Sequence, residues 1–209
     1  SWVTLVILII LVTISGCQTQ TNEVAEHTTW SHYAGSPDQS KFFESPSITK
    51  SNVEQMELLW SYPSGDDRFY FFSPIIVDST MYVLGKNSSL IAINAKTGKE
   101  LWIHTDLPGI TRRGINYWES EDKKNKRLLF TLNNSIQAID AVTGKSVMDF
   151  GNNGYLDLRE GLDRDPTSIT RIQSMMPGVI YDDLLILGSA PGEAYFSPPG
   201  HVRAYNVVT

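Results

Sequence analysis

The chain has 209 residues, 41% of them hydrophobic and 19% charged, and its formal net charge is −6. This length and composition suit a globular protein with one ordinary core and exclude a chain that is disordered throughout. The densest group of basic residues, at positions 123–127, stands beside Glu119, Glu121 and Asp122, so no basic patch favours nucleic acid as a partner.

The first segment, residues 1–17, has the pattern of a lipoprotein signal peptide. Positions 2–14 are uncharged and mostly apolar, but this run is shorter than the roughly 20 residues that a membrane-spanning helix needs. Ser15 and Gly16 precede Cys17, and a lipoprotein signal peptidase needs small residues directly before its cysteine. The alternative is a short apolar helix followed by a buried free cysteine. We expect export to the periplasm and a lipid anchor on Cys17, in the cell membrane or the outer membrane.

The remaining chain divides into a tether and one domain. Residues 18–29 are polar and have no apolar period, as in a flexible tether. Residues 30–209 form the predicted folded domain. Cys17 is the only cysteine, so this domain is expected to hold together without disulfides.

The folded domain is predicted to be all-β. Short apolar runs rich in Val, Ile, Leu, Tyr and Phe alternate with turn residues, and no stretch has a sustained helical period. The expected strands cover residues 58–62, 75–77, 81–84, 90–94, 101–105, 127–132, 135–140, 178–181, 184–188 and 202–206.

A repeat runs through these strands. The segment AINAKTG at 92–98 matches AIDAVTG at 138–144, and AYNVVT at 204–209 begins a third copy. Ala92 to Ala138 is 46 residues and Ala138 to Ala204 is 66. These spacings fit one blade of a β-propeller and a second blade with an inserted loop, which we place at about residues 156–171.

Each copy predicts a strand, a tight turn and a second strand. The alanine is expected to pack between neighbouring sheets, and Asn94 or Asp140 to bond the turn amides. Gly98 or Gly144 supplies the positive φ that the turn requires, and Trp102 is expected to wedge one sheet against the next.

These copies resemble the tryptophan-docking repeat of pyrroloquinoline quinone (PQQ) dependent dehydrogenases, and the resemblance extends over residues 30–209. Residues 48–60 look like the opening of that family, 73–78 like the start of its first blade, and 113–118 (RGINYW) like a motif of its cofactor site. Residues 150–154, 158–162 and 199–206 look most like the glucose-dehydrogenase-like branch. The resemblance implies an eight-bladed propeller, of which this chain holds roughly the first three blades.

The resemblance also implies an activity. The family oxidises sugars or alcohols with PQQ and Ca²⁺ and passes the electrons to a quinone or a cytochrome. PQQ is a planar tricarboxylate with an ortho-quinone, so its pocket needs cations, hydrogen-bond donors and a hard divalent cation. In the family the arginine of the Arg-Gly motif reaches the quinone edge, which assigns Arg113 to the cofactor. The alternative for Arg113 is a surface arginine paired with a loop acid, and we treat its neighbour Arg112 as such a surface residue.

Three further residues are carried over from the family. Ser174 and Ser189 fall where hydroxyl donors to the cofactor carboxylates are expected, with turn formation as the alternative for both. Glu193 stands where the alcohol-oxidising members place a glutamate that ligates Ca²⁺. Because the glucose-type members use other calcium ligands, a plain loop carboxylate is the alternative for Glu193.

The sequence departs from the family pattern in three places. Leu107 and Pro108 occupy the region where the alcohol-oxidising branch has adjacent cysteines, which favours a sugar or polyol as substrate. Phe71 replaces a glutamate that contacts the cofactor. The catalytic aspartate, the other metal ligands and the stacking tryptophan of the family lie beyond Thr209, so we assign no catalytic residue and expect the chain alone to be inactive.

Two other functions compete with the dehydrogenase. One is a non-catalytic propeller lipoprotein that acts as an assembly scaffold, because a shared fold does not imply a shared activity. The other is a sugar-binding surface protein, in which the aromatic residues 69–72 would line a glycan site. The residues of the loops separate the dehydrogenase from the scaffold, since a scaffold has no use for Arg113 or Glu193 there.

Overall fold

The computed structural model describes residues 27–65 and 71–209. The predicted signal peptide, Cys17 and most of the predicted tether lie outside these residues. Over the ranges described, no helix is long and apolar enough to cross a membrane.

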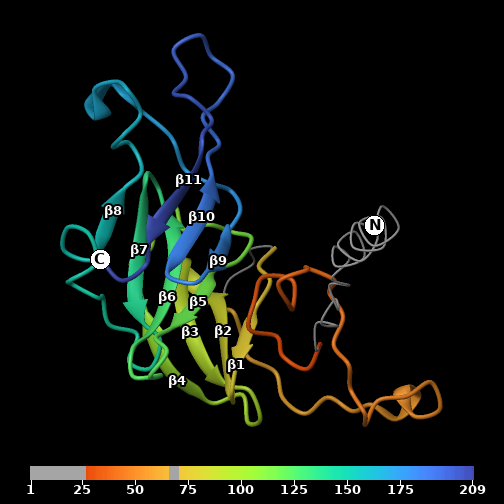
Figure 1. Cartoon of the computed structure of the whole chain (residues 1–209). Coiled ribbons are helices and arrows are strands. Elements are labelled where there is room, and N and C mark those ends of the chain that lie inside the picture. The colour runs from red at the N-terminus through yellow and green to blue at the C-terminus, as the bar shows by residue number, and fades with distance from the viewer. Residues whose placement is uncertain (1–26, 66–70) are drawn as a thin grey trace, which may run out of the picture.

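The described residues form eleven strands in three antiparallel sheets, in which strands adjacent in sequence pair with each other (Figure 1). The first sheet contains β1 (Ile75–Val77), β2 (Thr80–Gly85), β3 (Ser89–Asn94) and β4 (Glu100–His104). The second contains β5 (Asn116–Glu119), β6 (Lys126–Leu132), β7 (Ser135–Asp140) and β8 (Tyr155–Asp157). The third contains β9 (Val179–Tyr181), β10 (Leu184–Gly188) and β11 (Val202–Asn206). Short 3-10 helices cover Val53–Gln55, Lys86–Ser88 and Pro166–Ser168.

Three hairpins turn through two residues whose first member has a left-handed backbone. These residues are Asp78 between β1 and β2, Asn133 between β6 and β7, and Asp182 between β9 and β10, with φ of 54°, 53° and 49°. Asp and Asn tolerate this region better than other residues with a Cβ atom. The hairpin registers are therefore set locally by the turn residues.

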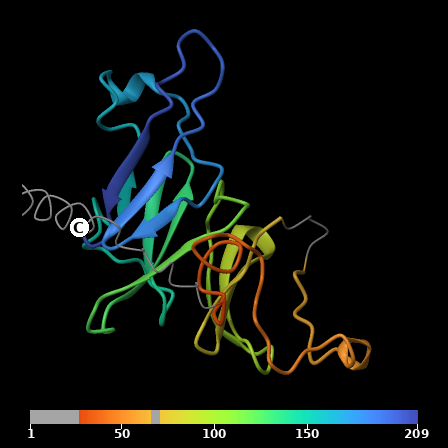
Figure 2. The same cartoon turned by 45° about the vertical axis from the view of Figure 1, so that its right-hand side comes forward.

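The second sheet lies between the first and the third (Figure 2). Successive side chains of β6 point alternately toward the first sheet and toward the third sheet. Leu128 and Phe130 pack in the buried cluster that includes the first sheet. Leu129 packs in the buried cluster with Leu185 of the third sheet. Consecutive sheets stacked face to face in chain order are the arrangement of successive propeller blades.

The predicted tryptophan contact joins the first sheet to the second. Trp102 Nε1 donates to the Ala141 carbonyl at 3.1 Å, and its ring lies against Gly144, whose φ is +71°. Asp140 Oδ1 accepts hydrogen bonds from two backbone N–H groups of the same turn. The Tyr82 hydroxyl also donates to the Ala141 carbonyl at 3.1 Å. The repeat thus fixes a turn in one sheet and a docking surface for the sheet before it.

Trp60 makes the same contact with the first copy of the repeat. Its Nε1 donates to the Ala95 carbonyl at 3.0 Å and its ring lies against Gly98. The strand predicted at residues 58–62 is nevertheless wrong, because no described strand lies alongside to complete a ladder. Leu58 and Leu59 are accordingly 84% and 77% exposed.

At the third sheet an arginine replaces the tryptophan of the repeat as donor to the turn carbonyl, while Trp118 of β5 donates from Nε1 to Asp183 Oδ1 at 3.0 Å. Met148 stands where the second copy would carry the tryptophan, and it is exposed. Arg127 of β6 is 4% exposed and donates from Nη1 to the Val207 carbonyl at 2.8 Å. Its guanidinium lies 5.7 Å from the ring centroid of Trp118 on β5. Val207 holds the same place in its copy as Ala141, so Arg127 takes over the hydrogen bond to that carbonyl.

Two strands differ from the sequence prediction. β5 begins inside the segment 113–118, which the resemblance marks as a cofactor motif, so only the first part of that motif is a loop. β8 occupies the first residues of the expected insertion, and the loop between the second and third sheets therefore runs over residues 158–178. β8 pairs only at the edge through three residues, too few to show an alternating pattern.

The outer face of the third sheet is open to solvent. Ala92 and Ala138 are completely buried between sheets, whereas Ala204 of the third copy is exposed. Ile186 and Val202 on the same face are 37% and 73% exposed.

Candidate cofactor-binding pocket

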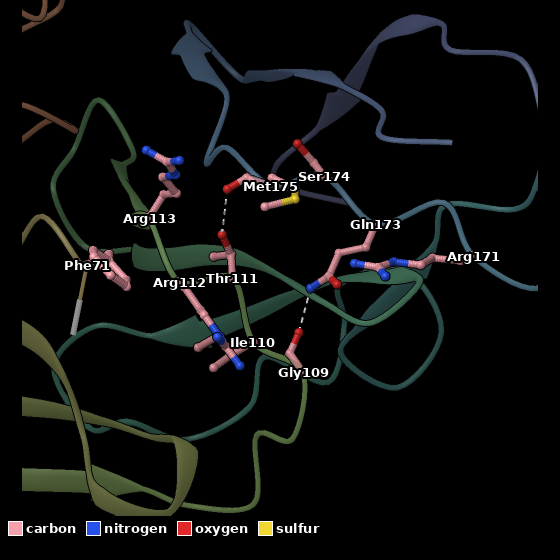
Figure 3. A pocket seen from close by; sticks show the side chains of 10 residues that line it. All are labelled: Phe71, Gly109, Ile110, Thr111, Arg112, Arg113, Arg171, Gln173, Ser174 and Met175. Carbon is pink, nitrogen blue, oxygen red and sulfur yellow. Dashed lines mark hydrogen bonds between the residues drawn. The ribbon is translucent and has the colours of Figure 1, made fainter. Parts of the chain in front are cut away.

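A pocket of about 550 Å³ opens where the chain enters the first strand of each sheet (Figure 3). Phe71 precedes β1, residues 109–113 precede β5 and residues 171–175 precede β9. Three loops from three sheets therefore meet at one end of the fold. The lining residues are Phe71, Gly109, Ile110, Thr111, Arg112, Arg113, Arg171, Gln173, Ser174 and Met175.

Side-chain hydrogen bonds tie the second-sheet loop to the third-sheet loop. Thr111 Oγ1 donates to the Met175 carbonyl at 3.2 Å, and Thr131 Oγ1 donates to the Ser174 carbonyl at 3.1 Å. The Thr111 backbone N–H donates to the Thr131 carbonyl at 2.9 Å. Since Thr131 lies on β6 and is buried, both loops are fixed to a rigid strand.

Gln173 adds a second link between these loops. Its Nε2 donates to the Gly109 carbonyl at 2.5 Å, as Figure 3 shows. The Gln173 carbonyl in turn accepts a 3.3 Å hydrogen bond from the Ala190 backbone, on the loop between β10 and β11. The pocket wall is thus held on both sides by backbone and amide groups.

Arg113 is held in place by its backbone. Its carbonyl accepts a 2.9 Å hydrogen bond from the Ser73 N–H, which connects it to the segment leading into β1. At the next position, Gly114, an added Cβ atom would lie 2.6 Å from the Tyr33 ring, so the chain can pass only with glycine there. The contact with Tyr33 explains why a glycine follows Arg113. The Arg113 side chain itself is exposed at the pocket.

Three guanidinium groups make the pocket cationic. Arg112, Arg113 and Arg171 all line it, and the lining that the structure describes includes no carboxylate. Among the described residues, no ion pair or hydrogen bond engages any of these three side chains. Arg112, which we expected to lie outside the site, is therefore a pocket residue, and that expectation is wrong.

Ser174 lies in the pocket wall, and its hydroxyl is already engaged. The residue is buried, its Oγ donates to the Met176 carbonyl at 2.9 Å, and it accepts from the Met176 N–H at 3.3 Å. Its role in the structure is to shape the turn before β9. Its assignment as a cofactor donor stays a prediction.

Ser189 and Glu193 do not line this pocket. Ser189 Oγ donates to the His201 carbonyl at 3.2 Å and closes the base of the loop between β10 and β11. Glu193 lies exposed further along that loop. In the ranges 27–65 and 71–209, no group of three or more His, Cys, Asp or Glu side chains is placed to hold a metal ion. Glu193 therefore has no companion ligands there, and its assignment to calcium stays a prediction.

Thr111, Arg171 and Gln173 line the pocket although no sequence pattern predicts it. None of them belongs to a repeat or a recognised motif, and they reach the pocket only because loops from different sheets converge. Phe71 does line the pocket, at the position where the family resemblance places a cofactor contact.

The chain is similar to known proteins over most of its length. Residues 30–209 match the PQQ family described as the glucose/ethanol/alcohol dehydrogenase β-propeller domain. The quinate/shikimate dehydrogenase (quinone) of Acinetobacter baylyi is 25% identical, over 86% of this chain and 26% of its own length. The quinohemoprotein alcohol dehydrogenase ADH-IIG of Pseudomonas putida is 28% identical, over 86% of this chain and 24% of its own length.

A solved structure shows the same fold. The quinohemoprotein alcohol dehydrogenase of Comamonas testosteroni matches with a TM-score of 0.66 and 22% identity, over 88% of this chain and 26% of that chain. The chain spans about a quarter of the length of these relatives. Since the family match covers the whole of residues 30–209, the chain belongs to the PQQ-dependent glucose/ethanol/alcohol dehydrogenase family and is part of its β-propeller domain.

Proposed function

We propose that the protein carrying this chain is a PQQ-dependent dehydrogenase that oxidises a sugar or an alcohol and passes electrons to a quinone or a cytochrome. The observation that carries this proposal is the cationic pocket around Arg113, at the end of the fold where three loops meet. Relatives named as a quinoprotein glucose dehydrogenase and a 1-butanol dehydrogenase (cytochrome c) support the substrate class and the acceptor.

The pocket fits the charge of the cofactor. PQQ carries three carboxylates, and the pocket presents three arginines without an acidic side chain in its described lining. Arg113 would hold the quinone edge, because a planar guanidinium can bind two adjacent oxygen atoms. When bound, PQQ supplies the quinone that accepts the two electrons removed from the substrate.

Other parts of the reaction need residues that the structure does not describe. Glu193 offers one carboxylate, so a calcium site would take its other ligands from elsewhere in the protein. The base that removes the hydroxyl proton of the substrate is likewise expected beyond Thr209. We further propose that the protein is exported and held at a membrane by a lipid on Cys17, which rests on the sequence alone.

The role of Arg113 can be tested with a matched pair of substitutions in the full-length gene product. Arg113→Lys keeps the charge but loses the planar fork, and we expect PQQ to bind about ten- to a hundredfold more weakly. Arg164→Lys is the control, because Arg164 is exposed, lies outside the pocket lining and donates to the backbone carbonyls of Phe196 and Ser197. The measurement is reconstitution of the apoprotein with PQQ and Ca²⁺, followed by titration of sugar and alcohol oxidation.

Each outcome bears on a different part of the proposal. Identical titration curves for Arg113→Lys and Arg164→Lys would remove Arg113 from the cofactor site. A wild-type protein without any PQQ-dependent oxidation of a sugar or an alcohol would favour the scaffold function instead.

A further inference from the structure

We propose that Arg171 is a second carboxylate-binding residue of this pocket, so that the bound molecules present carboxylates at two separate positions. The inference rests on the proposed function and adds a residue and a ligand requirement to it. The backbone of Arg171 is fixed, and its guanidinium makes no ion pair or hydrogen bond with the described residues. Arg171 also lies on a different wall of the cationic pocket from Arg113.

The backbone around Arg171 is fixed on both sides by one side chain. Asn134, in the turn between β6 and β7, donates from Nδ2 to the Thr170 carbonyl at 3.1 Å. The Oδ1 atom of Asn134 accepts from the Ile172 N–H at 2.9 Å, and Ile172 is completely buried. Arg171 is thus held between two anchored neighbours, and its side chain projects into the pocket lining.

Within residues 27–65 and 71–209, no acidic side chain pairs with Arg171, although its loop and the strand before it contain several. Asp157 is already paired with Arg159 at 2.7 Å. Asp165 accepts hydrogen bonds from the backbone and the hydroxyl of Thr167. Glu160 and Asp163 of the loop make no ion pair with Arg171 either, and its guanidinium has no hydrogen bond or ion pair within the residues that the structure describes.

Arg171 and Arg113 belong to different walls of the pocket. Arg113 comes from the loop before β5 and Arg171 from the loop before β9, and Figure 3 shows Thr111 and Met175 between them. Three guanidinium groups that have no partner among the described residues lie around one pocket, and they repel each other unless an anion is present. A guanidinium binds a carboxylate through two parallel hydrogen bonds. One carboxylate at each wall would therefore neutralise Arg113 and Arg171.

The second carboxylate can come from two sources. It can belong to PQQ, which carries three, or to an acidic polyol that binds beside the cofactor. The chemistry recognised by Arg171 is the same in both cases, and direct binding measurements separate them.

The test uses Arg171→Gln in the full-length gene product, with Arg164→Gln as the charge-matched control. The first arm measures the Kd of PQQ for the apoprotein by calorimetric titration. The second arm measures the Kd of D-gluconate and of neutral D-glucitol for the PQQ-loaded protein. Arg171→Lys, which keeps the charge without the fork, should give intermediate values and guards against a folding defect in Arg171→Gln.

A rise of about tenfold or more in the Kd of PQQ assigns Arg171 to the cofactor. An unchanged Kd for PQQ, with gluconate binding about tenfold weaker and glucitol binding unaffected, assigns it to an acidic substrate. Kd values that match those of Arg164→Gln for all three ligands would overturn the inference while leaving Arg113 in place. A wild-type protein that binds no PQQ would overturn the proposed function and this inference with it.

Discussion

A single methyl group at Gly144 tests how the repeat joins one sheet to the next. Gly144 has φ of +71°, and a Cβ atom there would lie 2.6 Å from the Trp102 ring. That ring cannot move away freely, because its Nε1 donates to the Ala141 carbonyl at 3.1 Å. Gly161 provides a matched comparison, since it has the same φ of +71° and nothing within 4 Å of an added Cβ.

The two substitutions should separate backbone strain from the clash. A residue with a Cβ atom in the left-handed region costs about 1–2 kcal/mol, which is the whole expected effect of Gly161→Ala. Overpacking adds about 1–3 kcal/mol at Gly144, so Gly144→Ala should lower the free energy of unfolding by about 2–5 kcal/mol. If Trp102→Leu is introduced first, the clash is gone and Gly144→Ala should cost only the strain.

Equilibrium urea unfolding of the full-length gene product measures these differences, provided that the m-values of the variants agree. Equal losses for Gly144→Ala and Gly161→Ala would show that the tryptophan contact contributes nothing at this position. A cost of Gly144→Ala that does not change in the Trp102→Leu background would refute the clash as its cause.

Two other changes test separate parts of the molecule. Arg127→Met removes the donor that binds the Val207 carbonyl and leaves that buried acceptor unpaired, so we expect a loss of about 2–4 kcal/mol in urea unfolding; a loss below about 0.5 kcal/mol would mean that Trp118 and the apolar contacts dock the third sheet without Arg127. Cys17→Ser should leave the protein exported but released from membranes by mild washing. Retention of Cys17→Ser in the membrane fraction would contradict the lipid anchor.

The repeat made most of the fold predictable. Alternation and turn residues indicate nine of the eleven described strands, because a buried strand between two sheets needs apolar side chains on both faces. β5 and β8 escape notice because one begins within a cofactor motif and the other is a short edge strand. The segment around Trp60 shows the opposite error, since its apolar residues predict a strand that no described neighbour pairs with.

The pocket was only partly predictable, for a different reason. Arg113 belongs to a family motif and Ser174 stands at a position where the family resemblance implies a hydroxyl donor. Both residues line the same pocket. Arg112 and Arg171 carry no such signal, since an arginine in a loop is ordinary until the fold shows what lies beside it. The convergence of loops that belong to different sheets depends on the stacking of those sheets, which local patterns do not encode.

The links between sheets also bear on how the protein folds. Trp102 and Arg127 each reach from one sheet to the sheet that follows it along the chain. Each sheet can therefore assemble on its predecessor without waiting for a partner that is distant in sequence. The exposed apolar face around Ile186 and Val202 is the kind of surface through which a partly assembled stack of sheets aggregates with other chains.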